Sequence, residues 1–98
     1  MRYICSVIVS FNHKGLKQFF ESGNASKLTP EHVHKIRLIL TRLHAASSPA
    51  EMDVPGYKLH KLTGTLKDFW SVKVDKNYRI IFRFVGEDVA DVEYIDYH

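Results

Sequence analysis

The residues best suited to chemistry lie in the second half of the chain. Residues 57–84 contain two aspartates and seven cations, which are Lys58, Lys61, Lys67, Lys73, Lys76, Arg79 and Arg83. The same stretch holds His60, and the sequence closes with Asp96-Tyr97-His98. Lysine and arginine complement phosphate groups, and an imidazole or a phenol can transfer protons near neutral pH. A surface that gathered these side chains would suit RNA.

Strand alternation is what would bring these side chains together. Successive side chains of a β-strand point to opposite faces of the sheet. In the expected strands, apolar residues such as Trp70, Val72, Ile80 and Phe82 fall on one face. If the helices cover that face, the open face collects Lys58, His60, Lys73, Arg79 and Arg83.

Both features also have an ordinary explanation. Lysine and arginine are common on a solvated strand face, so alternation alone does not distinguish a binding surface from a plain exterior. The terminal triplet directly follows an expected strand. If that strand continues, Asp96 and His98 share one face and Tyr97 lies on the other. A chain end that frays without functional consequence is the alternative there.

The period of the apolar residues predicts the fold. Residues 3–10 are rich in Ile and Val and predict a first strand, and two amphipathic helical segments follow. The period then changes to two, and four strands are expected at residues 57–62, 69–74, 78–85 and 89–97. Their short links favour antiparallel neighbours. The predicted fold is α+β, with the order β-α-α-β-β-β-β and two helices on one face of a mostly antiparallel, twisted sheet.

The first helix is predicted from signals at its two ends. Asn12 is the expected N-cap, and Phe11 and Leu16 occupy the positions of a hydrophobic staple around it. Gly23 supplies a left-handed stop. The helix between these signals is short.

The second helix has the clearer pattern. Thr29 is its expected N-cap and Pro30 its first residue, where a missing N–H costs nothing. An apolar stripe at helical spacing is expected to face the core and consists of Val33, Ile36, Leu40 and Leu43. His32 falls on another face of this pattern, and the helix stops by Pro49.

Composition excludes several classes of protein. Ninety-eight residues with 45% hydrophobic content predict one domain, residues 1–98, and a net charge of +3 is weak evidence for a polyanionic partner. The single Cys5 excludes an internal disulfide, and no spacing of Cys or His resembles a zinc motif, so neither metal nor cofactor is expected. No segment approaches the ~20 apolar residues of a membrane span or shows a signal-peptide pattern, which predicts a cytoplasmic protein without a membrane partner.

Several short segments, taken in order, carry a family resemblance. They are Lys14-Gly15-Leu16, Phe19-Phe20-Glu21, Pro55-Gly56-Tyr57-Lys58-Leu59-His60, Trp70-Ser71-Val72, Asn77-Tyr78-Arg79-Ile80 and Asp96-Tyr97-His98. In this order and spacing the chain resembles, over nearly its full length, the HigB-type toxins of the RelE/ParE superfamily. The resemblance implies a RelE-like fold and a ribosome-dependent endoribonuclease that cuts translated mRNA on the 70S ribosome. It also implies a HigA-type antitoxin with a helix-turn-helix fold that neutralises the toxin. The toxin would contact operator DNA only through this antitoxin.

The resemblance implies roles for individual residues as well. It implies that His60 takes part in catalysis and that Arg79 contacts phosphate. It also implies that the terminal Asp96-Tyr97-His98 lies in the active site. From their charge, and not from the resemblance, five further cations are expected to bind the RNA backbone: Lys58, Lys61, Lys67, Lys73 and Arg83.

The loop after His60 departs from the family pattern. Thr63 stands where a lysine often precedes the glycine that matches Gly64, and Thr65-Leu66 replace a frequent Asp-Arg. Lys61 or Lys67 would restore the missing charge. Because of these departures, the contribution of this loop to activity and the codon preference do not carry over from the family.

The implied reaction needs no metal. The ribose 2′-OH attacks the adjacent phosphate, with His98 or His60 as general base and the other histidine or Tyr97 as general acid. Arg79, helped by Lys58, stabilises the pentavalent phosphate, and Asp96 orients a histidine. Two other functions fit the same sequence: a ParE-like toxin that poisons gyrase, and a non-catalytic RNA-binding module.

Overall fold

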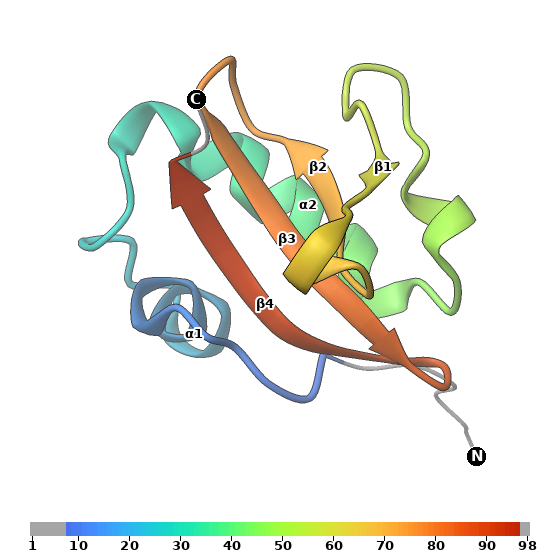
Figure 1. Ribbon diagram of the computed structural model, residues 1–98. Coiled ribbons are helices and arrows are strands. Elements are labelled where there is room, and N and C mark those ends of the chain that lie inside the picture. Colours follow the sequence, from blue (N-terminus) through green and yellow to red (C-terminus); the bar gives the residue numbers. More distant parts are fainter. Residues whose placement is uncertain (1–7, 97–98) are drawn as a thin grey trace.

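A four-stranded antiparallel sheet with two helices on one side organises the molecule (Figure 1). The computed structural model describes residues 8–96. The strands lie in the order β1-β2-β3-β4, and each is antiparallel to its neighbour, which confirms the predicted meander. The α-helices and strands of the molecule are α1 (Lys14–Ser22), α2 (Val33–Ala45), β1 (His60–Lys61), β2 (Trp70–Lys73), β3 (Tyr78–Val85) and β4 (Asp88–Asp96). Short 3₁₀ helices are η1 (Pro30–His32), η2 (Pro49–Met52) and η3 (Gly64–Leu66).

The predicted first strand at residues 3–10 lies mostly outside the described residues. Its described end runs beside β4, because Ile8 and Phe11 form isolated parallel bridges with Val89 and Val92. The backbone N–H of Val9 also donates to the carbonyl of Val89 at 2.7 Å. These bridges are the parallel component of a mostly antiparallel arrangement.

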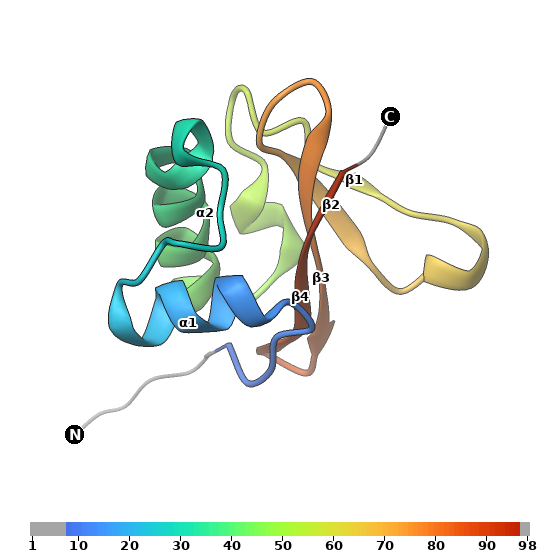
Figure 2. The same cartoon turned by 90° about the vertical axis from the view of Figure 1, so that its left-hand side faces the viewer.

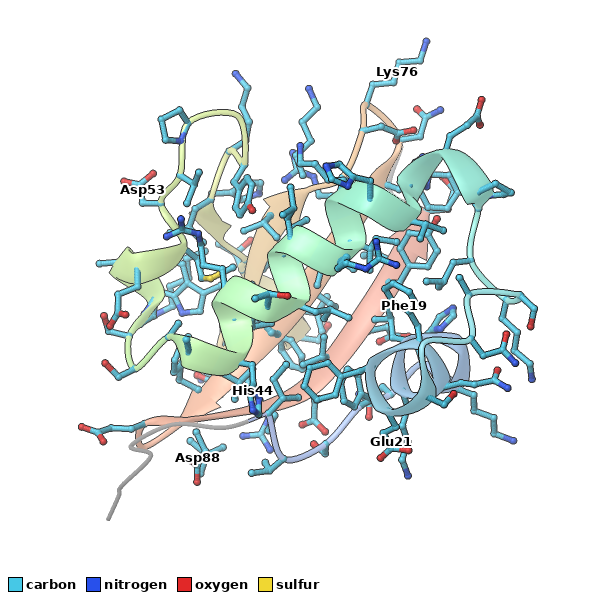
Figure 3. All side chains as sticks on the ribbon, turned by 180° about the vertical axis from the view of Figure 1, so that it is seen from behind. Phe19, Glu21, His44, Asp53, Lys76 and Asp88 are labelled. Carbon is cyan, nitrogen blue, oxygen red and sulfur yellow. The ribbon has the colours of Figure 1, made fainter. Side chains whose placement is uncertain are left out.

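Both helices pack on the same face of the sheet (Figure 2). From α2 the buried residues are Ile36, Ile39, Leu40 and Leu43, so three members of the predicted stripe are confirmed, while Val33 is only half-buried. The sheet contributes its apolar face, including the fully buried Val72, Ile80 and Phe82. Figure 3 shows Phe19 of α1 directed into this core and Glu21 directed away from it. Within residues 8–96, no helix has the length and apolar character needed to cross a membrane.

The start of α1 differs from the prediction. The N-cap is His13 rather than Asn12, and its ring Nδ1 accepts a hydrogen bond from the N–H of Leu16 at 3.2 Å. With the N-cap at His13, Phe11 and Leu16 no longer occupy the positions of a staple, and Phe11 packs on Phe20 with ring centroids 5.4 Å apart. The stop at Gly23 is confirmed, since Gly23 has a φ of 79° and its N–H donates to the carbonyl of Phe19.

A histidine N-cap makes the stability of α1 sensitive to pH. Burial lowers the pKa of His13 below its ordinary 6.5, an effect that Glu93 opposes and Lys27 reinforces. The unfolded chain therefore takes up this proton at a higher pH than the folded chain, and protonation removes the lone pair that caps Leu16. We expect the free energy of unfolding to decrease as the pH falls through about 6.5 and to level off below the folded pKa.

Chemical denaturation between about pH 7.5 and 5 measures this effect. His13→Asn keeps a capping side chain but cannot titrate, so the variant should lose less stability than the wild type across that range. His34→Asn replaces an exposed histidine of α2 and controls for the substitution. Parallel pH profiles for the wild type and His13→Asn would contradict the expectation.

Gly15 lies where α1 meets the following loop. A Cβ at this position would lie 2.8 Å from the Cβ of Lys27 and 2.9 Å from the Cε1 of His13. In an open helix, Gly→Ala is stabilising by about 1 kcal/mol. Here we expect Gly15→Ala to lower the free energy of unfolding by about 1–3 kcal/mol, because the backbone or the capping ring must move. Denaturant titration checks this, with Glu21→Ala on the exposed face of α1 as control; a more stable Gly15→Ala variant would contradict it.

The first strand of the meander is shorter than predicted. Residues 57–62 were expected to be extended, but only His60 and Lys61 pair with β2. Gly56 and Lys58 both adopt positive φ angles, 91° and 52°, so the chain turns where the strand was expected to begin. Tyr57 is buried in this turn, and its carbonyl accepts from the N–H of Lys73.

The start of the second helix was also predicted incorrectly in part. Thr29 precedes η1, whose residues form a 3₁₀ turn before α2 begins at Val33, and its side chain makes no capping hydrogen bond to that turn. His32, expected on an outer face, is only 6% exposed. Its ring packs against Tyr78 and Tyr94 of the sheet.

Candidate active site

The register of the sheet places four of the predicted site residues on the face that the helices leave uncovered. Paired residues in an antiparallel sheet share a face. Arg79 pairs with Lys73 on one side and Ile95 on the other, and His60 pairs with Ser71. Arg83 pairs with Ala90 and has the same parity as Arg79 in β3. His60, Lys73, Arg79 and Arg83 therefore lie on the side opposite α1 and α2 (Figure 2).

Two cations face each other directly at the centre of this surface. Lys73 of β2 and Arg79 of β3 are cross-strand partners. Like charges in such a pair destabilise a sheet, since their Cβ atoms are only about 5 Å apart. An anion placed between them removes that repulsion, and a phosphate group matches both side chains. The pair is a candidate site for a phosphate group.

Ser71 connects this pair to His60. Its hydroxyl accepts a hydrogen bond from Nη1 of Arg79 at 3.0 Å, and the residue itself is fully buried. His60 lies beside Ser71 across the β1–β2 pairing. The serine thus holds the guanidinium on the strand that pairs with His60. The strand pattern had placed Ser71 on the open face without giving it a role; a lone hydroxyl within an apolar strand was the available signal.

The ring of His60 is oriented by a backbone carbonyl. Its Nδ1 donates to the carbonyl oxygen of Lys58 at 3.3 Å, and the side chain is exposed. Because a carbonyl only accepts, the proton of the neutral ring sits on Nδ1 and the lone pair on Nε2. An exposed Nε2 with a free lone pair is what a general base requires.

Arg83 is paired with an aspartate. The Nε of Arg83 donates to Oδ2 of Asp91 at 2.6 Å. Asp91 has a φ of 54° at the irregularity in the β3–β4 pairing, and its N–H donates to the hydroxyl of Ser10 at 2.8 Å. The aspartate neutralises much of the charge of Arg83, which weakens this arginine as a phosphate ligand.

The remaining predicted cations are dispersed. Lys58 precedes β1 in a left-handed conformation and is exposed. Lys61 pairs with Trp70, so it lies on the opposite face from His60, with its Nζ 5.8 Å from the Trp70 ring centroid. Lys67 caps η3 in the loop between β1 and β2. None of these three lysines belongs to the cross-strand pair of Lys73 and Arg79.

The terminal triplet is described only at its first residue. Asp96 pairs with Tyr78, directly beside the Arg79–Ile95 pair, and is exposed. It therefore lies at the same end of the sheet as Arg79. Because Arg79 pairs with Ile95 and Asp96 is the next residue, Asp96 lies on the opposite face of the sheet from Arg79. Tyr97 and His98 lie outside the described residues.

The β1–β2 connection forms a wall beside His60. The segment containing η3 projects from the sheet on the side away from the helices (Figure 2). A pocket of about 180 Å³ lies at its base, lined by His60, Lys61, Leu62, Thr63 and Leu66. A larger hollow of about 480 Å³ is lined by residues of α2 and η2 with Tyr57, and it contains neither His60 nor Arg79. The chemistry of its side chains makes the open sheet face the candidate site.

The described residues offer no cluster for a metal. Within residues 8–96, no group of three or more His, Cys, Asp or Glu side chains is arranged to hold a metal ion. The functional groups brought together on the open face are an imidazole, a hydroxyl and two cations. These groups can bind an anion and move a proton.

Sequence comparison shows which known proteins this chain is similar to. The profile of a family described as the RelE-like toxin of the type II toxin–antitoxin system HigB matches residues 9–98. The chain is 39% identical over 92 residues to a protein of Proteus vulgaris named endoribonuclease HigB, covering 94% of this chain and all of the relative. It is 34% identical over 92 residues to toxin HigB-1 of Vibrio cholerae, covering 92% and 96% of the two chains.

Comparison with solved structures supports the fold. A YoeB/ParE toxin from Agrobacterium tumefaciens is similar with a TM-score of 0.54 and 15% identity, over 95% of this chain and 96% of that one. YafQ from E. coli gives a TM-score of 0.54 and 12% identity, over 96% and 93%. At this identity the likeness shows a shared architecture and gives no information about activity.

Proposed function

We propose that this chain, which belongs to the family of HigB-like toxins of type II toxin–antitoxin systems, is an endoribonuclease that cleaves mRNA on the translating ribosome. One observation carries the proposal beyond the family: Lys73 and Arg79 face each other across β2 and β3, with His60 and Ser71 beside them. A positive site for phosphate next to an oriented imidazole is the minimum that phosphodiester cleavage requires.

The proposed reaction is attack of a ribose 2′-OH on the neighbouring phosphorus. A bond forms between the 2′ oxygen and phosphorus, and the bond from phosphorus to the 5′ oxygen breaks. The products are a 2′,3′-cyclic phosphate and a 5′-hydroxyl. Nε2 of His60 takes the 2′ proton, because Nδ1 is already committed to the carbonyl of Lys58.

The other groups act on charge and on the leaving oxygen. Arg79 stabilises the additional negative charge on the pentavalent phosphate, and Ser71 holds the guanidinium in place. His98 or Tyr97 protonates the 5′ oxygen, and Asp96 orients the terminal histidine. Lys58, Lys67, Lys73 and Arg83 contact the RNA backbone. Side chains supply all the proton transfers and charge interactions that this reaction uses, so the proposal includes no metal or cofactor.

The proposed partners follow from the same reaction. The 70S ribosome holds the mRNA in the geometry that brings a 2′-OH in line with the phosphate, a contribution that a flexible RNA in solution lacks. A HigA-type antitoxin with a helix-turn-helix fold would neutralise the protein and mediate any contact with operator DNA. The site of action would be the cytoplasm, where translation occurs.

Cleavage on programmed ribosomes tests the proposal. Purified protein is mixed with 70S ribosomes that carry a defined mRNA, and the 5′ ends of the products are mapped. We expect cleavage at discrete positions on the ribosome-bound mRNA and little or none on the same mRNA alone. An intact message would contradict the proposal.

The same preparation separates the alternatives. Inhibition of gyrase-dependent supercoiling without mRNA cleavage would indicate a gyrase poison. RNA binding with a steep salt dependence and no products would indicate a binding module.

A further inference from the structure

A buried histidine links three parts of the fold at the end of the sheet. His32 lies at the end of η1 and is 6% exposed. Its Nδ1 lies 2.6 Å from the hydroxyl of Tyr94 in β4, and its Nε2 lies 2.6 Å from Oδ2 of Asp75 in the β2–β3 turn. Burying an imidazole is favourable only when both nitrogens have partners, and here both do.

Stacked aromatic rings surround this histidine. The His32 and Tyr78 rings are 4.8 Å apart, and the Tyr78 and Tyr94 rings are stacked at 5.1 Å with an angle of 24° between them. His13, the N-cap of α1, places its ring edge-on to Tyr94 at 5.5 Å. Rings packed on several sides restrict one another, so a change at His32 is transmitted to both tyrosines.

The carboxylate of Asp75 fixes the turn that leads into β3. Its Oδ1 accepts hydrogen bonds from the N–H groups of Asn77 and Tyr78, each at 2.8 Å, while Oδ2 accepts from His32. The hydrogen bond from the Asn77 backbone, with those from His32 and Tyr78, lowers the pKa of Asp75 below its ordinary value. Asp75 therefore stays ionised at neutral pH and holds the turn and the histidine at once.

The residues held by this network are the neighbours of the candidate active site. Tyr78 directly precedes Arg79 and is the cross-strand partner of Asp96. Tyr94 directly precedes Ile95, the partner of Arg79. The β2–β3 turn and the end of β4 lie at the same end of the sheet (Figure 1), and Figure 3 shows Lys76 of this turn at the opposite end from Asp88.

We propose that His32 is a positioning residue for the cleavage reaction: by joining Asp75 to Tyr94, it fixes the end of the sheet that carries Arg79 and Asp96. This inference rests on the proposed function, since it assigns His32 a role in that reaction. His32 contacts the sheet from the helix side, so it does not touch RNA. Its effect reaches the substrate through the positions of Tyr78 and Tyr94.

Kinetics separate positioning from a purely structural role. His32→Ala and Asp75→Ala should lower the cleavage rate at saturating ribosome concentration by on the order of 10-fold to 10²-fold, since small displacements of catalytic groups have effects of that size. The ribosome concentration at half-saturation should change little. Asp75→Asn keeps the oxygen that accepts from the turn and a polar group facing His32, so it should retain most of the wild-type rate.

The control removes a carboxylate from the other end of the sheet. Glu87 lies in the exposed turn between β3 and β4, and Glu87→Ala should cleave at the wild-type rate. If His32→Ala is too unstable, Tyr94→Phe removes only the hydroxyl that faces Nδ1 and should also slow cleavage. Variants that lower the unfolding temperature but cleave at the wild-type rate, measured well below that temperature, would overturn the inference.

An NMR measurement decides the question independently of activity. Backbone amide signals of Arg79, Ile95 and Asp96 should shift in His32→Ala and Asp75→Ala and stay in place in Glu87→Ala. Unchanged signals would overturn the inference even if the wild type cleaves mRNA. A wild type that does not cleave, together with shifted signals, would reject the proposed function and leave the positioning of this end of the sheet supported.

Discussion

Replacing His60 with alanine is expected to lower the single-turnover rate of mRNA cleavage on programmed ribosomes by on the order of 10²–10⁴-fold. The ring is exposed, and the carbonyl of Lys58 holds its Nδ1, so the base function resides in Nε2. Removing an exposed ring costs little stability, and the unfolding temperature should stay within about 4 °C of the wild type.

His34→Ala is the matched control for this substitution. It removes an exposed histidine from α2, on the side of the molecule away from the open sheet face. We expect His34→Ala to cleave at the wild-type rate. Equal rates for His60→Ala and the wild type would assign the base to another group, with His98 the next to test by the same substitution.

Replacing Arg79 with alanine is expected to lower the cleavage rate by on the order of 10²–10³-fold, as the loss of one preorganised charge donor does. The guanidinium is fixed by Ser71 and faces Lys73 across the strand pair. Arg79→Lys keeps the charge but loses the planar fork that matches a phosphate, so its rate should fall between those of the wild type and Arg79→Ala.

Stability must be measured beside these rates because Arg79 also serves the fold. Its loss leaves the buried hydroxyl of Ser71 without this donor. Repulsion from Lys73 disappears at the same time, which partly offsets that cost. Arg42→Ala removes an exposed arginine from α2 and should leave cleavage unchanged. A wild-type rate in Arg79→Ala would exclude Arg79 from the transition state.

Local patterns predicted most of the scaffold. Alternation in β2 and β3 placed Val72, Ile80 and Phe82 in the core, because a strand buried on one face must repeat every two residues. Gly23 ends α1 with a positive φ, as a left-handed stop requires. The open face could be predicted for the same reason, since Lys73 and Arg79 alternate with those core residues.

Contacts between distant segments could not be predicted in this way. His32 is buried because Asp75, 43 residues away, and Tyr94, 62 residues away, supply partners for its ring. Helical periodicity contains no information about such partners. The short β1 depends likewise on the left-handed conformation of Lys58. Residues with a Cβ atom rarely adopt this conformation, and no propensity predicts it for a lysine.

The N-cap of α1 shows a third kind of error. Asn12 has the better capping propensity, but its N–H donates to the carbonyl of Val92 in β4, so the residue belongs to the segment that runs beside the sheet. His13 is the next residue, and its ring accepts from Leu16. Tertiary pairing, rather than propensity, sets where this helix begins.

A single 2′-deoxy substitution in the mRNA tests the central claim most directly. The cleavage position is first mapped on programmed ribosomes, and the nucleotide 5′ to the scissile phosphate is then replaced by its deoxy analogue. The account predicts that cleavage at this position stops, and that the all-ribose message yields a 2′,3′-cyclic phosphate and a 5′-hydroxyl. Continued cleavage of the deoxy substrate, or products with 5′-phosphate ends, would contradict it.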